Sequence, residues 1–230
     1  MRNKVDAIIF DFGDTIATLN PSKETIVKSF LARKDVDISI EEIIYAYRIV
    51  GYSYKQSALK LKDSEKKRAF LFQLNIELLK VLGLAKRADL WKSELYDLFQ
   101  AKKKWELYSD VLEVLAHFKR KGYKIAILAN WDKNLKTIVK GLGIDQYFTQ
   151  VLSSEEIHEE KPNPDAFFHI LRLLSVSPEK ATYVGNEYEV DVIGSRSAGL
   201  LSVLIDRNRF WSHADCLRIE NLLELAEYFQ

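Results

Sequence analysis

The segment Val5-Asp6-Ala7-Ile8-Ile9-Phe10-Asp11-Phe12-Gly13-Asp14-Thr15 decides the fold of this chain. A short apolar run over residues 5–10 breaks off at a polar turn that contains a glycine. A run of this length, bounded by turn residues, is typical of a buried strand in a parallel sheet. Ligands of such sheets bind where the strands end. The turn that begins at Asp11 is therefore the first candidate functional site.

The second half of the chain alternates between strand and helix patterns. Short apolar runs lie at residues 124–128, 148–152, 181–184 and 201–205, and helical patterns at 110–122, 132–142, 164–174 and 190–198 separate or flank them. Repeated strand–helix units imply a parallel sheet with helices on both faces. The predicted fold class is therefore α/β, with a Rossmann-like core.

The stretch from Asn20 to about Gln100 has helical patterns throughout and no convincing strand. Ser39 and Glu42 form a capping box ahead of an apolar stripe, and Asp63 is a candidate cap for the next helix. We therefore expect an all-helical domain at 19–100, inserted into a core formed by 1–18 and 101–230. Within the insertion, the segment 51–55 is a candidate turn facing the substrate.

The amino-acid composition limits the kinds of molecule that this protein is expected to bind. The chain of 230 residues has 34 basic and 33 acidic side chains, so its charges nearly cancel and give no argument for nucleic acid or an anionic membrane. Its single cysteine, Cys216, excludes an intrachain disulfide and favours a reducing, cytoplasmic location. No apolar stretch approaches the length of a membrane span. The expected partner is a small-molecule substrate.

Four polar motifs carry the candidate chemistry: Asp11-Phe12-Gly13-Asp14-Thr15, Ala129-Asn130, Lys161-Pro162-Asn163-Pro164, and Gly185-Asn186 through Asp191. Their order and spacing resemble the haloacid dehalogenase superfamily of hydrolases. The helical insertion resembles the helical cap of that family, of the C1 type. The resemblance implies a hydrolase with an aspartate nucleophile, most often a small-molecule phosphatase.

The resemblance also assigns roles to residues. Asp11 would be the nucleophile, which must be held in line with its target because a carboxylate is otherwise a poor nucleophile. Lys161 would act in catalysis and bind substrate, because an ammonium offsets charge on the nucleophile and the transferred anion. Asn130 would bind substrate. The implied magnesium ligands are Asp11, the Gly13 carbonyl, Asn186 and Asp191, in keeping with the preference of Mg²⁺ for oxygen ligands.

Three positions depart from the phosphatase pattern. Gly13 stands where family phosphatases carry a second aspartate, a general acid–base whose contribution is about 10²–10⁴-fold. Ala129 replaces a hydroxyl residue, and Asn186 replaces a metal-binding aspartate. Asp14 is a candidate replacement for the missing acid, and Glu187 a candidate replacement ligand.

These departures leave three alternatives. The first is a phosphatase-type enzyme with atypical motifs. The second is a 2-haloacid dehalogenase, which needs neither the second aspartate nor magnesium; Asn186 favours this alternative. However, the Asn186-to-Asp191 spacing matches phosphatases, and Gly13 lacks the aromatic side chain of the dehalogenases. The third is a catalytically weak or non-enzymatic member that binds a ligand or a partner.

Overall fold

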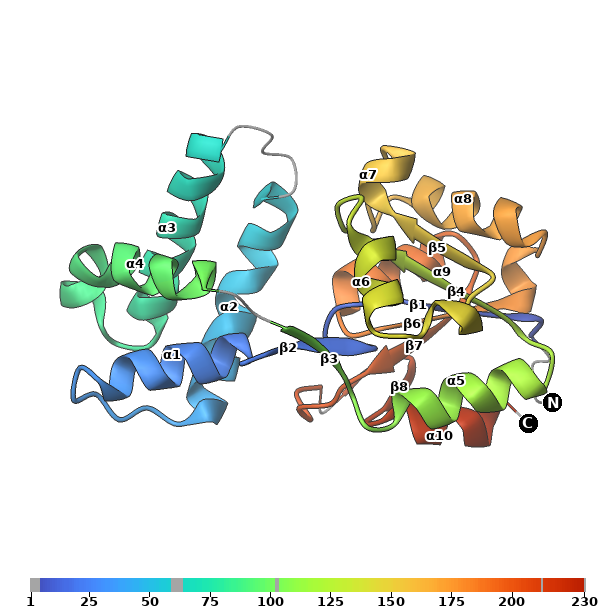
Figure 1. Cartoon of the computed structure of the whole chain (residues 1–230), viewed down its shortest axis with the longest axis horizontal. Coiled ribbons are helices and arrows are strands. Elements are labelled where there is room, and N and C mark those ends of the chain that lie inside the picture. Colours follow the sequence, from blue (N-terminus) through green and yellow to red (C-terminus); the bar gives the residue numbers. More distant parts are fainter. Residues whose placement is uncertain (1–4, 59–63, 102–103, 212, 230) are drawn as a thin grey trace. The chain divides into compact units, whose positions relative to one another are not determined.

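A computed structural model describes residues 5–58, 64–101, 104–211 and 213–229 (Figure 1). The chain divides into two compact units, Met1–Thr18 with Trp105–Gln230, and Leu19–Lys104. The elements are, in chain order, β1 (Ala7–Phe10), β2 (Ala17–Asn20), α1 (Lys23–Ala32), α2 (Ile40–Ala58), α3 (Ser64–Val81), α4 (Ala85–Gln100), β3 (Lys104–Leu107), α5 (Val111–Arg120), β4 (Lys124–Ala129), α6 (Leu135–Gly141), η1 (Asp145–Tyr147), β5 (Gln150–Ser153), α7 (Ser154–Ile157), α8 (Pro164–Leu174), η2 (Pro178–Lys180), β6 (Ala181–Gly185), η3 (Tyr188–Ile193), α9 (Gly194–Ser197), β7 (Leu201–Ile205), β8 (Leu217–Ile219) and α10 (Leu222–Tyr228).

The first unit contains a parallel sheet of six strands in the order β5-β4-β1-β6-β7-β8. The predicted α/β fold class is confirmed. All four residues of β1 are buried, because the strand is central and helices cover both faces. β2 and β3 pair with each other in a separate two-stranded sheet.

Alternating side chains of the strands enter two hydrophobic cores. Ile8 and Phe10 pack on the face that is covered by α5 and α10, whereas Ala7 and Ile9 pack on the face covered by α8 (Figure 1). This alternation is the period of two that a strand imposes. The buried sheet gives the turns after its strands a rigid support.

The second unit contains the predicted helical insertion, α1–α4; the strands β2 and β3 that precede and follow it were not predicted. Its core includes Phe30, Leu78 and Trp91, with an edge-to-face contact of the Phe30 and Trp91 rings. The capping box is present: the Ser39 N–H donates to Glu42, and the Glu42 N–H to the Ser39 hydroxyl. None of the helices in the described ranges has the length and apolar character needed to cross a membrane.

Several predicted boundaries differ from the structure. The expected turn at 51–55 lies inside α2, and its side chains, like the expected cap Asp63, lie outside the described residues. The helix expected from Asp132 begins at Leu135, because the Asp132 side chain accepts the Asn134 N–H in a turn. The helix expected at 190–198 is a π-helical turn, η3, followed by the short α9.

Candidate active site

The parallel register brings three of the predicted site residues to one edge of the sheet. Phe10 of β1 lies beside Ile127 of β4 and Val184 of β6. The chain therefore leaves these strands at neighbouring points, where Asp11, Asn130 and Asn186 follow. Gly185 permits this arrangement, because a Cβ atom there would lie 2.3 Å from Cγ of Asp191.

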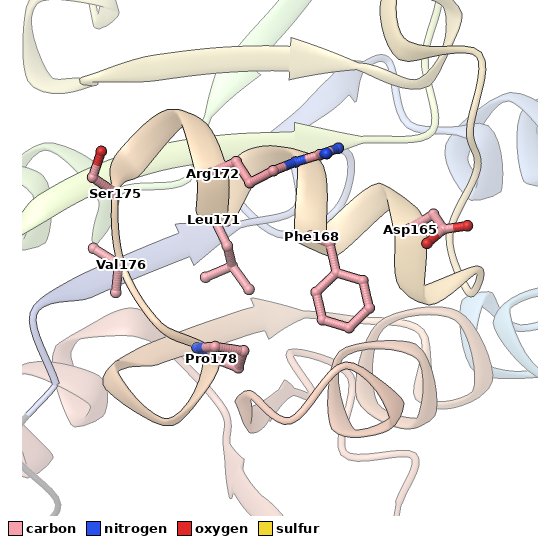
Figure 2. A pocket seen from close by; sticks show the side chains of 7 residues that line it. All are labelled: Asp165, Phe168, Leu171, Arg172, Ser175, Val176 and Pro178. Atoms are coloured by element: carbon pink, nitrogen blue, oxygen red, sulfur yellow. The ribbon is translucent and has the colours of Figure 1, made fainter.

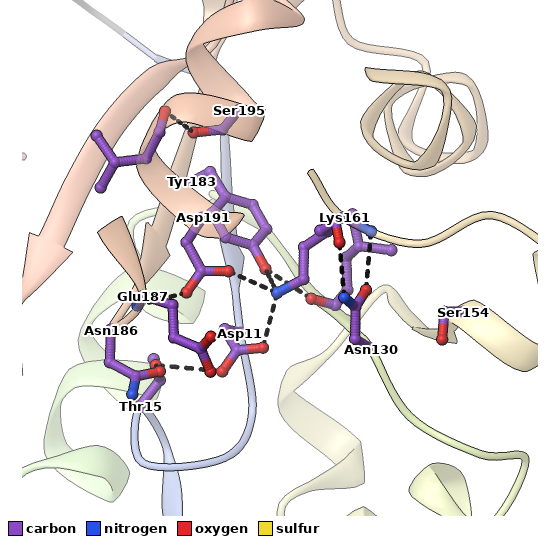
Figure 3. Close-up of polar contacts among 12 residues, drawn as sticks. Asp11, Thr15, Asn130, Ser154, Lys161, Tyr183, Asn186, Glu187, Asp191 and Ser195 are labelled. Atoms are coloured by element: carbon purple, nitrogen blue, oxygen red, sulfur yellow. Dashed lines mark hydrogen bonds and ion pairs between the residues drawn. The ribbon is translucent and has the colours of Figure 1, made fainter. Parts of the chain in front are cut away.

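Lys161 joins the site from a loop rather than from a strand end. It follows α7, and its ammonium lies between two carboxylates (Figure 3). Nζ is 2.8 Å from Oδ1 of Asp11 and 2.7 Å from Oδ1 of Asp191. The third ammonium hydrogen has an acceptor 2.6 Å away, the Tyr183 hydroxyl, which itself donates to the Leu128 carbonyl. Three acceptors saturate this buried ammonium.

The electrostatics of the site follow from burial and from these pairings. Burial lowers the pKa of Lys161, but the attraction of Asp11 and Asp191 outweighs it, so the pKa lies well above its usual value. Burial raises the pKa of Asp191 to about 6; the Lys161 ammonium opposes this, and the negative charges of Asp11 and Glu187 add to it. Burial thus outweighs the attraction of the lysine, and the surroundings on balance disfavour the charged form of Asp191.

Asn130 holds the main chain of Lys161. Its amide nitrogen donates to the Lys161 carbonyl at 2.8 Å, and its amide oxygen accepts the Lys161 N–H at 2.8 Å. Two reciprocal hydrogen bonds fix the loop from which the ammonium projects. The side chain expected to bind substrate thus makes two hydrogen bonds to the main chain of Lys161.

Trp131 lies against Gly13. A Cβ atom at position 13 would be 3.3 Å from Cζ3 of the Trp131 ring. The ring is held by Phe12 and Trp105, with centroids 5.4 and 5.1 Å away, and its main chain is bonded to Ser154. The space beside Gly13 is thus bordered by an immobilised indole. An aromatic side chain does stand here, although it comes from another strand end.

Asp14 does not take the place of the missing acid. Its backbone is left-handed, with a φ of 58°, and its carboxylate accepts the Thr18 hydroxyl at 3.2 Å. The Asp14 N–H donates to the Ala17 carbonyl. These bonds direct Asp14 into the turn that leads to β2.

A family model for haloacid dehalogenase-like hydrolases matches residues 5–199. The chain belongs to this family. The glyceraldehyde 3-phosphate phosphatase of Methanopyrus kandleri is 28% identical over 218 residues, which are 90% of this chain and 86% of that protein. A haloacid dehalogenase-type phosphatase of Thermococcus onnurineus is 25% identical, with a TM-score of 0.58 over 96% of each chain. A dehalogenase solved with an intermediate complex has the same fold, with 21% identity and a TM-score of 0.67 over 100% of this chain and 99% of that one.

Enzymes of this hydrolase family act on small molecules and typically use Mg²⁺. In this hydrolase the predicted ligands fit that ion in part. Asp11 Oδ2 and Asn186 Oδ1 lie 3.4 and 3.3 Å from the Thr15 hydroxyl, so both oxygens point toward this same hydroxyl group. Both oxygens of Asp191 already accept a hydrogen bond, one from Lys161 Nζ and one from the Glu187 N–H, so among the predicted side-chain ligands Asp191 is the least available to a metal ion. Within the described ranges no three acidic, His or Cys side chains form a metal-binding group.

Sequence reasoning missed three contributors to this hydrolase site: Thr15, Tyr183 and the Trp131 wall. Thr15 stands within the first motif, four residues after Asp11, so the sequence could have indicated that it lies close to Asp11. No sequence pattern around Tyr183 or Trp131 indicated a role in the site, because Tyr183 resembles an ordinary strand residue and Trp131 an ordinary turn residue. Their contacts form only when the strands are placed side by side.

A pocket lined by other residues lies elsewhere in the described chain (Figure 2). It has a volume of about 610 Å³ and is lined by α8 and the segment up to Pro178, including Phe168 and Arg172. None of the predicted site residues lines it. The chemistry of this hydrolase is therefore assigned from the polar contacts around Asp11 rather than from pocket size.

Proposed function

We propose that this protein hydrolyses a small-molecule phosphate ester through Asp11 as a nucleophile. The observation that carries the proposal is the ammonium of Lys161, buried between the carboxylates of Asp11 and Asp191. A buried cation at this place holds the Asp11 carboxylate in one orientation, as a carboxylate nucleophile requires. The similarity to the Methanopyrus kandleri phosphatase over most of both chains supports the phosphate ester as substrate.

The reaction has two steps. A carboxylate oxygen of Asp11 attacks phosphorus, the bond from phosphorus to the ester oxygen breaks, and the alcohol leaves with a proton from water. Water then attacks phosphorus in the aspartyl phosphate, which releases inorganic phosphate and restores the Asp11 carboxylate. Lys161 holds Asp11 through both steps, and Asn130 holds Lys161. Where Mg²⁺ binds, we propose Asp11, the Gly13 carbonyl and Asn186 as its ligands, with Glu187 as a further candidate; a bound ion would offset negative charge on the substrate.

The leaving group decides which phosphate esters are good substrates. No side chain at Gly13 donates a proton, and the Trp131 ring borders that space. A leaving group that departs as a stable anion needs no proton, whereas an alkoxide does. We therefore propose that acyl and aryl phosphates are hydrolysed faster than alkyl phosphates.

The test compares acetyl phosphate, p-nitrophenyl phosphate and glycerol phosphate, with and without Mg²⁺. Turnover should fall in that order and should be lost in Asp11→Asn. Asp14→Asn, which changes the adjacent carboxylate, is the matched control and should keep its turnover. No hydrolysis of any of these three phosphate compounds would refute the proposal.

Dehalogenation is the second candidate, because the Trp131 ring supplies an apolar wall beside Gly13 and halide needs no proton. In that reaction Asp11 would displace halide from the carbon of a 2-haloacid, and water would attack the Asp11 carboxyl carbon. Turnover in H₂¹⁸O separates the two reactions. The label enters phosphate when water attacks phosphorus, and enters Asp11 when water attacks the ester carbon.

A further inference from the structure

Arg207 contacts the turn that carries Asp11, although it lies beyond the residues 5–199 that the family model matches. It lies two residues after the end of β7. Its Nη2 donates to the Thr15 carbonyl at 2.8 Å. The same guanidinium makes a two-point ion pair with Asp110, with Nη1–Oδ2 and Nη2–Oδ1 distances of 2.8 and 3.1 Å. One side chain thus links the end of the sheet, the start of α5 and the nucleophile turn.

The guanidinium is fixed on several sides. The Arg207 and Asp110 side chains are only 14% and 6% exposed. Asp110 Oδ2 also accepts the Leu222 N–H, at the start of α10, at 2.8 Å. The guanidinium carbon lies 3.8 Å from the centroid of the Tyr108 ring. Only a planar, forked cation makes all these contacts together, so a lysine cannot replace it.

The contacts continue to the nucleophile. The Tyr108 N–H donates to the Ile16 carbonyl, so Arg207 and Tyr108 hold two successive carbonyls of the turn. The Thr15 hydroxyl lies 3.4 Å from Asp11 Oδ2. We propose that Arg207 is a positioning residue for Asp11, which fixes the turn through the Thr15 carbonyl. The inference rests on the nucleophilic role of Asp11 given in the proposed function.

Arg218 offers a matched control. It is a second arginine of the C-terminal segment, and its Nε lies 2.8 Å from Oδ2 of Asp206. Its Nη2 bonds to Glu220, so both of these ion pairs stay within that segment. Arg218→Met removes both of these ion pairs from the same region without breaking a bond to the nucleophile turn. A purely stabilising role of Arg207 would make the two variants alike.

The experiment measures amide hydrogen exchange of residues 11–17 by mass spectrometry in the wild type, Arg207→Met and Arg218→Met. Exchange in Arg207→Met should be faster by at least about 10-fold, the effect of losing a charge-assisted hydrogen bond, and in Arg218→Met unchanged. With p-nitrophenyl phosphate, kcat should fall about 100-fold in Arg207→Met with a smaller change in KM, because the nucleophile is misplaced. Arg207→Lys should resemble Arg207→Met.

Arg207→Met leaves the Asp110 carboxylate buried without its partner and can fail to fold for that reason. The double variant Asp110→Asn/Arg207→Met removes both charges, and the introduced amide oxygen keeps an acceptor for the Leu222 N–H. It should show the same fast exchange at residues 11–17. Exchange equal to that of the wild type in this double variant would overturn the inference. The exchange readout does not need turnover, so it decides the role of Arg207 even if the wild type hydrolyses no phosphate ester.

Discussion

Adding the missing acid at position 13 should restore general acid catalysis only after the Trp131 ring is removed. In Gly13→Asp the new Cβ atom would lie 3.3 Å from Cζ3 of Trp131, closer than an ordinary contact. The ring cannot easily yield, because Phe12 and Trp105 pack on it. Overpacking of this kind typically costs about 1–3 kcal/mol. Gly13→Asp alone should therefore lower the free energy of unfolding by that amount and bring no gain in turnover.

The double variant Gly13→Asp/Trp131→Ala gives the new carboxyl group room beside Asp11. Turnover of an alkyl phosphate should then rise by about 10²-fold, the lower end of what a general acid supplies. The assay is steady-state release of phosphate from glycerol phosphate, together with urea denaturation of each variant. The difference between alkyl and aryl phosphates should shrink in the same variant, because the alkoxide now receives a proton.

Trp105 supplies the matched control. Its ring packs on Phe12 and Trp131 in the same aromatic cluster. However, no atom of Trp105 lies within 4 Å of the place that a Cβ atom at position 13 would take. In Gly13→Asp/Trp105→Ala the Trp131 ring keeps its contact with Phe12 and its main-chain bonds to Ser154, so it still borders position 13, and turnover should rise far less than in the double variant with Trp131→Ala. If Gly13→Asp alone were as active as the double variant with Trp131→Ala, the Trp131 ring would not be the obstacle, and the reasoning would be refuted.

Three further predictions concern the charges of the site. Lys161→Met leaves two carboxylates without their shared cation and should lower the free energy of unfolding in urea by about 3–5 kcal/mol. A urea midpoint equal to that of the wild type would contradict a stabilising role of these ion pairs. Because the folded-state pKa of Asp191 is raised from 3.8 to about 6, the stability that this group contributes should be highest below pH 4 and fall as the pH rises to about 6, by up to about 3 kcal/mol. Denaturation between pH 4 and 7 checks this, and Asp191→Asn should remove that part of the slope. Asn130→Ala breaks both bonds to the Lys161 main chain and should reduce kcat about 10-fold or more with little change in KM; a change confined to KM would instead indicate that Asn130 contacts substrate.

The sequence predicted those parts of the site that depend on local pattern. A buried apolar run that ends in a polar turn places Asp11 and Asn186 at a sheet edge, whatever the rest of the chain does. The helical insertion was likewise visible, because its capping box and apolar stripes are local signals. Ser153 with Glu156 at α7, and Asn221 with Glu224 at α10, form further capping boxes that the same reasoning would have found.

Contacts between distant segments could not be predicted in this way. Trp131 and Gly13 are far apart in the chain and meet only because β1 and β4 are neighbours in the sheet. The Asn130 side chain can form hydrogen bonds with a substrate or with the main chain. Whether it bonds to the main chain depends on where the fold places Lys161. The bond from Arg207 to the Thr15 carbonyl depends on where β7 ends, which no local pattern around Arg207 specifies.

The most direct test of the nucleophilic role of Asp11 is to trap the intermediate on its side chain. The enzyme is quenched during turnover of p-nitrophenyl phosphate and reduced with borohydride, which converts an aspartyl phosphate or ester to homoserine. Peptide mass spectrometry then locates the change. We predict homoserine at position 11, and none without substrate. Turnover with Asp11 unmodified, or with homoserine at another carboxylate, would contradict that role.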